Sequence, residues 1–314
     1  MTLSFDALSR LRVLCAPHPN LPHTRPMPPH PARRSVLAGT FATLAAPALA
    51  ADPAHRRLAA IRSSVGGRLG LAALDTGSGR RLLFDADARY AMASTFKLPL
   101  AAAILHEVER GRLSPGQRVP VPAGPLPPPS PVVERLRAAG PVTVDALAAA
   151  IVEVSDNGAA NLLLQLIGGP AGLTRFMAQA GDRISRLDRW EVALNENRPG
   201  DPRDTTAPAA MLGLTRRLLL DPVLTPASRA RLIGWMEAST TGRDRLRAGL
   251  PPAWRAGDKT GTGARGAVND LCIAWPPGRP PILIACYLDG SPRPTPELAA
   301  VHAEVGRAVA EAFA

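Results

Sequence analysis

Only two lysines occur among the 37 basic residues of this 314-residue chain, and each lies in a short motif. Lys97 ends a Ser-x-x-Lys motif at residues 94–97, and Lys259 begins a Lys-Thr-Gly motif at residues 259–261. Arginine stays protonated at any ordinary pH, whereas a buried lysine can lose its proton and act as a base or relay. We therefore expect proton-transfer chemistry at these two positions; the alternative is that two lysines occur there by chance.

Ser94 is the candidate nucleophile. A serine hydroxyl is a poor nucleophile and needs a nearby base. The apolar spacing over 95–110 predicts a helix, and residues three apart on a helix share a face, so Lys97 would lie beside Ser94. The positive field of the helix N-terminus favours alkoxide character on the serine. A neutral Lys97 could accept its proton, although Ser-x-x-Lys alone is a weak signal and the alternative is a surface serine.

Two further motifs follow in the chain. Ser155-Asp156-Asn157 lies between two predicted helices, where the ordinary alternative is an N-capping turn. Lys259-Thr260-Gly261 ends a predicted strand, where the alternative is an exposed strand end. The three motifs together, in this order, are a far more specific signal than any one of them.

Strands are predicted at both ends of the chain, with helices between them. We predict strands over 68–75, 81–85, 255–259, 268–275 and 282–287, and helices over 95–110, 144–154, 159–167, 207–220, 225–238 and 296–313. The proline-rich stretch 120–131 is predicted to be irregular, and 186–206 to be a long surface loop of the kind that carries function. This pattern indicates an α/β fold with a sheet built from both termini. The α/β domain would comprise 51–88 and 239–314, and an all-helical middle domain 89–238 would include the loop 186–206.

Composition limits the function classes. The chain is 46% hydrophobic and 20% charged, which is typical of a globular protein. Its net charge of +11 comes from scattered arginines, and only 4% of residues are aromatic, so nucleic-acid binding is disfavoured. The histidines form no ligand cluster, and we expect no metal and no cofactor. Cys272 and Cys286 lie in apolar strands and are predicted to be buried thiols, with a disulfide left open.

The first 50 residues are interpreted as an export leader. Arg33-Arg34 precedes a weakly apolar, alanine-rich stretch that ends at Ala48-Leu49-Ala50, a small-x-small cleavage pattern. The paired arginines resemble a twin-arginine signal. We expect cleavage near Ala51 and a periplasmic protein without stable membrane association; Met27 is an alternative start.

The three motifs resemble those of class A serine β-lactamases, and the resemblance extends over about 51–314. Residues 186–195 closely match the omega-loop segment of that family, and 203–206 would close the loop. The resemblance implies a β-lactamase-like fold with an antiparallel sheet, an Arg189–Asp204 salt bridge across the neck of the loop, a β-lactam substrate as the partner, and a monomer. Glu191 would be the water-activating residue, the alternative being an ordinary acidic loop residue.

The resemblance also implies a role for each candidate site residue. Ser94 would attack the β-lactam carbonyl, with an oxyanion hole formed by the N–H groups of Ser94 and Thr262. Glu191 would activate the water that hydrolyses the acyl-enzyme, and either Lys97 or Glu191 would deprotonate Ser94. The implied catalytic residues are Ser94, Lys97, Ser155, Glu191 and Lys259, and the implied substrate- or water-binding residues are Asn157, Asn195, Thr260, Gly261, Thr262 and Arg245. Arg245 has the alternative of being one surface arginine among 35.

Four positions depart from the family pattern. Val192 follows Glu191 where proline is usual, so this peptide bond is either cis, as in many relatives, or trans with Glu191 held differently. We expect hydrolysis to survive, with slower deacylation of some drugs. Pro129 stands where relatives often have an aromatic gate, which predicts a more open entrance. Ala93 and Gly263 cannot form the disulfide of some carbapenem-hydrolysing relatives, which weakens the expectation of that activity without excluding it.

Two rival functions stay open at this point. A DD-peptidase would be acylated and release its product slowly, and it would not need Glu191 and Asn195. A β-lactam sensor would stay acylated and would need a signalling partner. The sequence alone does not rank penicillins, cephalosporins and carbapenems as substrates, because that ranking depends on sub-ångström loop geometry.

Overall fold

A computed structural model describes residues 52–314, so the predicted leader lies outside the described residues. The main strands are β1 (Arg68–Asp75), β2 (Arg81–Phe84), β7 (Arg255–Thr262), β8 (Val268–Trp275) and β9 (Ile282–Asp289). The short strands are β3 (Tyr90–Ala91), β4 (Arg118–Val119), β5 (Val142–Thr143) and β6 (Thr205–Thr206). The helices are α1 (Pro53–Val65), η1 (Ala93–Phe96), α2 (Lys97–Glu109), α3 (Pro131–Arg137), α4 (Val144–Glu153), α5 (Asn157–Leu166), α6 (Gly169–Gln179), η2 (Ala193–Asn195), α7 (Pro208–Leu219), α8 (Pro226–Ala238), α9 (Leu246–Gly249) and α10 (Thr295–Ala312).

The five main strands form one antiparallel sheet in the order β2-β1-β9-β8-β7. β1 pairs with β9 along its whole length, from Arg68 opposite Asp289 to Asp75 opposite Ile282. The sheet is therefore built from the two ends of the described chain, which confirms the predicted fold class. β7, which carries the Lys-Thr-Gly motif, is an edge strand.

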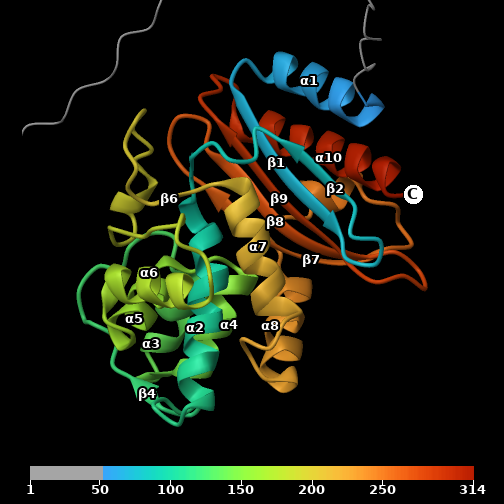
Figure 1. Ribbon diagram of the computed structural model, residues 1–314. Helices are drawn as coiled ribbons and strands as arrows, with labels where there is room; N and C mark the ends of the chain where they lie inside the picture. Colours follow the sequence, from blue (N-terminus) through green and yellow to red (C-terminus); the bar gives the residue numbers. More distant parts are fainter. Residues whose placement is uncertain (1–51) are drawn as a thin grey trace, which may run out of the picture. The chain divides into compact units, whose positions relative to one another are not determined.

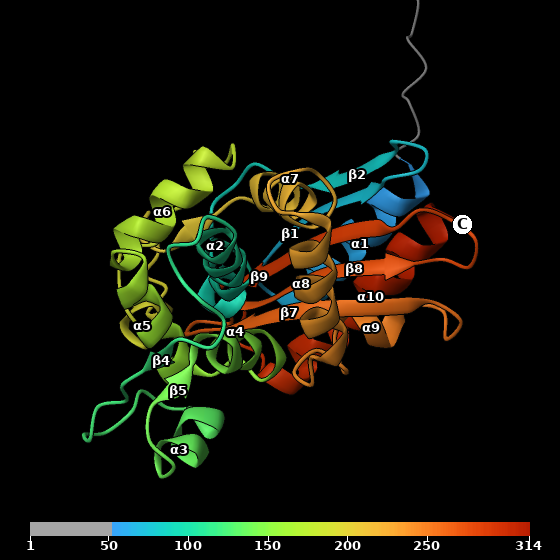
Figure 2. The ribbon, with the colours of Figure 1, turned by 90° about the horizontal axis from the view of Figure 1, so that it is seen from below.

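Both faces of the sheet are buried. Side chains alternate along a strand, and in β9 Leu283, Ala285 and Tyr287 belong to one hydrophobic cluster. Ile282, Ile284, Cys286 and Leu288 belong to another cluster on the opposite face. Helices α1 and α10 cover that second face, and α7 and α8 pack on the first (Figures 1 and 2). Burial on both sides explains why β1, β8 and β9 are mostly apolar runs.

Most of the remaining helices gather around α2, whereas α9 packs against α10. Helices α4, α5, α6 and α8 all contact it, and its residues Leu98 and Leu100 are fully buried (Figure 2). The N-terminus of α2 points to the sheet, because η1 contacts both β7 and β8. The turn at residues 92–94, which carries the candidate nucleophile Ser94 and is called the nucleophile turn below, therefore lies where the helices meet the edge strand. The division into an α/β domain and an all-α domain at the predicted boundaries stays a prediction.

Helices α1, α3, α6 and α9 were not predicted from the sequence. In α3 the prediction of irregular structure stops too late, because Pro131 is the first residue of the helix, a position that needs no backbone N–H donor. Cys272 and Cys286 are both buried and free, as predicted for two thiols, and burial raises the pKa of each well above its ordinary value. No helix within 52–314 is long and apolar enough to cross a membrane.

Candidate active site

The candidate nucleophile and its candidate base occupy the junction of two helices. Ser94 lies in η1, and Lys97 is the first residue of α2. The Lys97 Nζ donates a hydrogen bond to Ser94 Oγ at 3.0 Å, as the three-residue spacing predicts. The preceding residue, Ala93, has φ 43°, a left-handed conformation that L-residues rarely adopt. The turn that presents Ser94 is therefore held by its surroundings and not by its own backbone preference.

Lys97 also joins the nucleophile to the omega loop. Its Nζ lies 3.0 Å from Glu191 Oε1, and both side chains are completely buried. Since Nζ lies 3.0 Å from each oxygen, Ser94 Oγ and Glu191 Oε1 are at most 6.0 Å apart. Glu191 Oε2 accepts a hydrogen bond from Asn195 Nδ2 at 2.7 Å. The structure thus brings the predicted hydroxyl, amine, carboxylate and amide into one cluster, in which Lys97 and Glu191 are buried and Ser94 and Asn195 are partly exposed.

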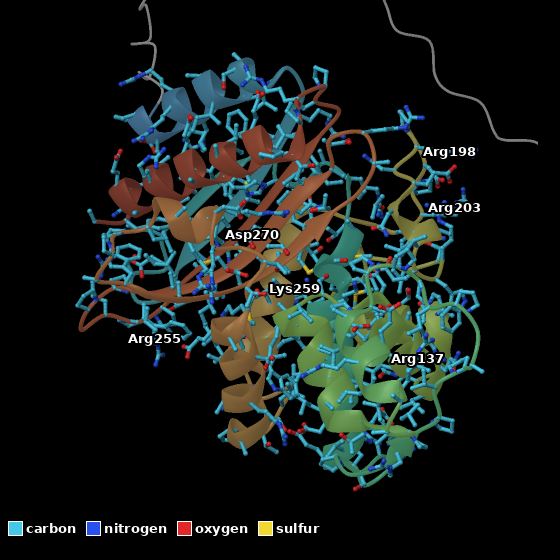
Figure 3. The ribbon with its side chains drawn as sticks, turned by 180° about the vertical axis from the view of Figure 1, so that it is seen from behind. Arg137, Arg198, Arg203, Arg255, Lys259 and Asp270 are labelled. Carbon is cyan, nitrogen blue, oxygen red and sulfur yellow. The ribbon has the colours of Figure 1, made fainter. Side chains whose placement is uncertain are left out.

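Ser155 connects the two lysines. Its Oγ accepts hydrogen bonds from Lys97 Nζ at 3.3 Å and from Lys259 Nζ at 3.1 Å. Lys259 comes from the edge strand β7, and Figure 3 shows it where the sheet meets the helices. Ser155 itself has φ 60°, so its backbone is also in the left-handed region. A serine held between two amines can pass a proton in either direction.

Burial makes both lysines unusual amines. Desolvation lowers the pKa of Lys97, and the neighbouring Glu191 carboxylate opposes that shift. Desolvation lowers the pKa of Lys259 well below its ordinary value, and the nearby Lys97 lowers it further. The sequence predicts proton transfer at the only two lysines of the chain, because an arginine there would stay charged. The lowered pKa of both lysines agrees with that expectation.

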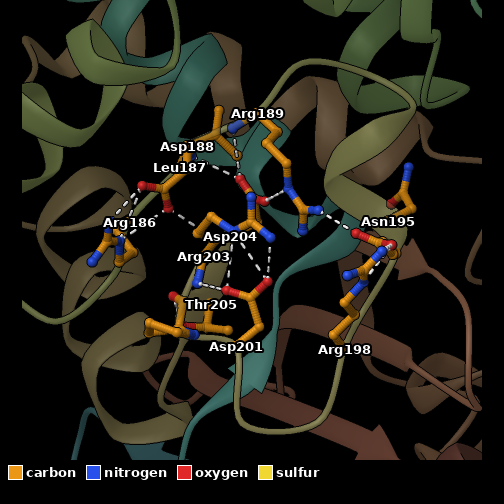
Figure 4. A network of polar contacts seen from close by, with 12 residues as sticks. Arg186, Leu187, Asp188, Arg189, Asn195, Arg198, Asp201, Arg203, Asp204 and Thr205 are labelled. Carbon is orange, nitrogen blue, oxygen red and sulfur yellow. Dashed lines mark hydrogen bonds and ion pairs between the residues drawn. The ribbon is translucent and has the colours of Figure 1, made fainter.

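The omega loop is anchored at its neck. Arg189 Nε lies 2.6 Å from Asp204 Oδ2, which confirms the predicted salt bridge. Asp204 Oδ1 also accepts hydrogen bonds from the backbone N–H groups of Asp188 and Arg189 (Figure 4). The Glu191–Val192 peptide bond is cis, which is the first of the two alternatives that the sequence left open.

The edge strand β7 forms the wall beside Ser94. A Cβ added at Gly261 would lie 2.8 Å from Met92 O and 3.1 Å from Ser94 N, so only glycine lets the strand come this close. Thr262 follows and is exposed at the rim. Thr260 Oγ1 lies 2.7 Å from Thr241 Oγ1. The close approach brings the outer edge of β7 to the nucleophile turn.

Comparison with known proteins agrees with this geometry. The family model described as "Beta-lactamase enzyme family" matches residues 53–313. The chain belongs to the β-lactamase enzyme family. Curated relatives include Beta-lactamase AST-1 of Nocardia asteroides, 45% identical over 84% of this chain and 84% of the relative. The carbapenem-hydrolyzing β-lactamase KPC of Klebsiella oxytoca is 44% identical over 80% of this chain and 84% of the relative.

Solved structures place the chain in class A of this family. A reconstructed last common ancestor of Gram-negative class A β-lactamases has a TM-score of 0.82 and 50% identity, and covers 84% of this chain and 100% of its own. A putative class A β-lactamase, PenP from Rhodopseudomonas palustris, has a TM-score of 0.81 and 46% identity, covering 83% and 100%.

In this β-lactamase family member Arg245 is no surface arginine. It is buried, and its NH1 group donates to Gly261 O at 3.0 Å and to Asn269 O at 2.7 Å. Its NH2 group donates to Thr262 Oγ1 at 2.7 Å. Arg245 therefore supports the rim of β7 from behind. Desolvation lowers the pKa of this guanidinium.

The Ser-Asp-Asn motif combines the functional interpretation with its structural alternative. Asp156 is the N-cap of α5 and accepts a hydrogen bond from Ala159 N at 2.8 Å. Asn157 points to the site: its Oδ1 accepts a hydrogen bond from Lys97 Nζ, and its Nδ2 donates to Pro128 O at 2.7 Å. The cap thus fixes the turn that presents Ser155 and Asn157.

Two asparagines that no sequence motif indicated also hold this β-lactamase site together. Asn161 brackets the backbone of Glu191, accepting from its N–H and donating to its carbonyl, both at 3.0 Å. Asn269 is fully buried, and its Nδ2 donates to Ala91 O and Met92 O at the start of the nucleophile turn. In the sequence, the only indication of either asparagine was a polar residue within an otherwise apolar predicted helix or strand. The described residues contain no group of three or more His, Cys, Asp or Glu that could hold a metal.

Proposed function

We propose that this protein is a serine β-lactamase that hydrolyses β-lactam antibiotics through an acyl-enzyme on Ser94. One observation carries the proposal: a single buried amine, Lys97 Nζ, lies 3.0 Å from both the Ser94 hydroxyl and the Glu191 carboxylate. A nucleophile with a base is sufficient for acylation. The carboxylate beside it supplies the second base that deacylation needs.

Acylation would begin when Ser94 Oγ loses its proton and attacks the β-lactam carbonyl carbon. Lys97 is placed to accept that proton directly, and Glu191 could accept it through a water molecule. As the ring C–N bond breaks, Ser155 Oγ gives its proton to the departing nitrogen. The hydrogen bonds from Lys97 and Lys259 to Ser155 keep this proton supplied. The N–H groups of Ser94 and Thr262 would stabilise the oxyanion, where one such donor contributes about 2.7–4 kcal/mol.

Deacylation would use a water held by Glu191 and Asn195. Asn195 Nδ2 is already bonded to the Glu191 carboxylate, which orients the amide. Asn195 Oδ1 is buried and accepts no hydrogen bond from residues 52–314. A water between the two side chains could donate to both, and Glu191 would take its proton as the oxygen attacks the ester.

Substrate recognition would follow the rim of β7. Thr260 and Thr262 present hydroxyls there, and Arg245 adds positive charge behind them, which suits the carboxylate of a β-lactam. Asn157 would receive the side-chain amide of the drug. Ala93 and Gly263 cannot form the disulfide of some carbapenem-hydrolysing relatives, which weakens the case for carbapenem hydrolysis, and the proposal does not rank penicillins, cephalosporins and carbapenems.

Turnover of a chromogenic cephalosporin tests the proposal. We expect many turnovers per enzyme, whereas a DD-peptidase or a sensor would give one stoichiometric burst. Glu191→Gln should convert the first behaviour into the second, because the amide keeps the shape but cannot accept the proton. A wild-type protein that stops after one equivalent would refute the hydrolase assignment.

We further propose that the protein is exported to the periplasm after cleavage near Ala51. The support is the sequence pattern of Arg33-Arg34 with Ala48-Leu49-Ala50. Mass spectrometry of the protein from a periplasmic extract should give an N-terminus at about residue 51. A periplasmic species that still contains Arg33 would contradict cleavage.

A further inference from the structure

A cavity of about 710 Å³ lies behind the omega loop, and none of the proposed catalytic residues lines it. Its walls come from the loop residues 197–202, the ends of β1 and β9, and the turn between β7 and β8. The charged residues that line it are Arg68, Arg89, Arg198, Arg265, Asp201 and Asp289. Its volume is in the range typical of small-molecule sites.

The two aspartates do not neutralise the four arginines. Asp201 is already paired with Arg203, whose NH2 group lies 2.7 Å from its carboxylate (Figure 4). Asp289 accepts a hydrogen bond from Asn197 Nδ2 at 2.7 Å and lies 3.4 Å from Arg68 NH1. Arg198 also pairs with Glu196 at 2.5 Å, and Arg68 lies 3.5 Å from Asp85. Arg89 and Arg265 form no ion pair within residues 52–314, so these two arginines give the cavity wall its excess positive charge.

Several guanidinium donors in this cavity are available to a ligand. The side chain of Arg265 is exposed and makes no hydrogen bond or ion pair with any other part of the described chain. Arg89 donates only through NH1, to Ile184 O and Thr205 Oγ1. Each guanidinium carries five N–H donors in a planar fork, which matches the oxygens of phosphate and carboxylate groups.

We propose that this cavity binds a small multivalent oxyanion, a molecule that carries two or more phosphate or carboxylate groups. Arg198 would reach it from the omega loop, Arg265 from the β7–β8 turn, and Arg68 and Arg89 from the side of the sheet. Arginines from three separate segments are needed to meet several charges at once, and one arginine could not do this. A single-charge anion would engage only part of the site and bind more weakly.

The ligand would tie together two segments that already touch. Asn195 O accepts a hydrogen bond from Ala264 N at 2.9 Å, and Asn197 Nδ2 donates to Ala264 O at 3.1 Å. An anion that bridges Arg198 and Arg265 would reinforce these bonds and stabilise the loop beside Asn195. This coupling to the water-binding residue rests on the proposed function, whereas the binding itself does not.

Titration calorimetry with pyrophosphate and with citrate, in the absence of any β-lactam, tests the binding. We expect one site per chain and an affinity that falls as salt rises, because the charges are partly exposed. Arg198→Ala and Arg265→Ala should each weaken binding at least tenfold. Arg137→Ala is the matched control: it removes the same charge from α3, outside this cavity, and should leave binding within twofold (Figure 3). Saturating pyrophosphate should also slow amide hydrogen exchange over 195–201.

The outcomes separate this proposal from the alternatives. If anion affinity falls equally in Arg198→Ala, Arg265→Ala and Arg137→Ala, only nonspecific attraction to a basic protein remains and the site is overturned. The absence of any binding by the wild type would overturn it as well. A second experiment replaces the soluble anions with vesicles that contain phosphatidylglycerol. If the protein binds these vesicles but neither pyrophosphate nor citrate, the small-molecule site is also overturned. If the wild-type protein binds the anions but does not turn over cephalosporin, the proposed function is refuted and this inference stands.

Discussion

The neck of the omega loop offers a direct test of how the loop supports hydrolysis. Asp204 is 1% exposed and accepts hydrogen bonds from two backbone N–H groups and from Arg189 Nε. In Asp204→Asn the amide oxygen can keep the two backbone donors, but its NH2 group then faces the Arg189 N–H. Removing one partner of a fully buried ion pair costs about 3–5 kcal/mol. Because Arg189 is 16% exposed and keeps Glu196 as a second partner, we expect about 2 kcal/mol here.

A destabilisation of about 2 kcal/mol raises the population of the open loop about 30-fold. Glu191 and Asn195 lie on this loop, whereas Ser94 and Lys97 do not. We therefore expect deacylation to slow by up to that factor while acylation stays within about threefold. Stopped-flow kinetics with a chromogenic cephalosporin should show a burst of one equivalent, followed by slow turnover. Mass spectrometry of the intact protein should detect the acyl adduct.

The control is Asp201→Asn in the same loop. Asp201 is paired with Arg203 and accepts a hydrogen bond from its backbone N–H, but it makes no hydrogen bond with Asp188 or Arg189 across the neck, so we expect no burst. Two results would refute the reasoning: unchanged turnover in Asp204→Asn, or slower turnover without an accumulated acyl-enzyme. The second result would mean that the loop supports acylation as well.

Three further predictions follow from the geometry. Lys97→Arg should nearly abolish acylation, since a guanidinium stays protonated, and acyl-adduct formation over time measures this. Gly261→Ala should lower kcat/KM about a hundredfold with a small change in Tm, because the new Cβ meets the backbone at Met92 and Ser94 and displaces β7; a variant with unchanged kcat/KM would show that the close approach is not required. Burial lowers the pKa of His302 to about 3, so the neutral ring contributes stability that is complete above pH 6.5 and is lost as the pH falls toward 3. Urea unfolding from pH 4 to 6.5 should therefore show a dependence steeper by about 1.4 kcal/mol per pH unit in the wild type than in His302→Gln, and equal slopes would contradict it.

Much of the site could be predicted because its chemistry lies in short motifs. Ser-x-x-Lys places two side chains on one helical face, and a buried lysine is identifiable where arginine is otherwise used throughout. The strands β1, β8 and β9 were predictable because two-sided burial produces long apolar runs. Their neighbours in the sheet were not, since a run of apolar residues does not say which strand it pairs with.

Other features depend on contacts that no local pattern records. Asn161 resembles any other polar residue in a helix until Glu191 lies across from it. Arg245 is one arginine among many until the fold buries it behind β7. Helix α1 was missed although Leu58, Ile61 and Val65 have helical spacing, because its charged residues dilute the apolar pattern. Helix α9 is only four residues long and has no periodicity to detect.

The pairing of β1 with β9 has a consequence for biosynthesis. Arg68 meets Asp289 only after more than two hundred further residues have been made, so a nascent chain holds its first strand without its neighbour. The sheet cannot close while the ribosome still retains the last segment, and such distant pairing is slow to form. Premature termination anywhere before residue 282 would therefore remove β9 and leave that edge of β1 unpaired. It would also remove α10, against which α1 packs. A truncated product should therefore be degraded and should not retain partial activity.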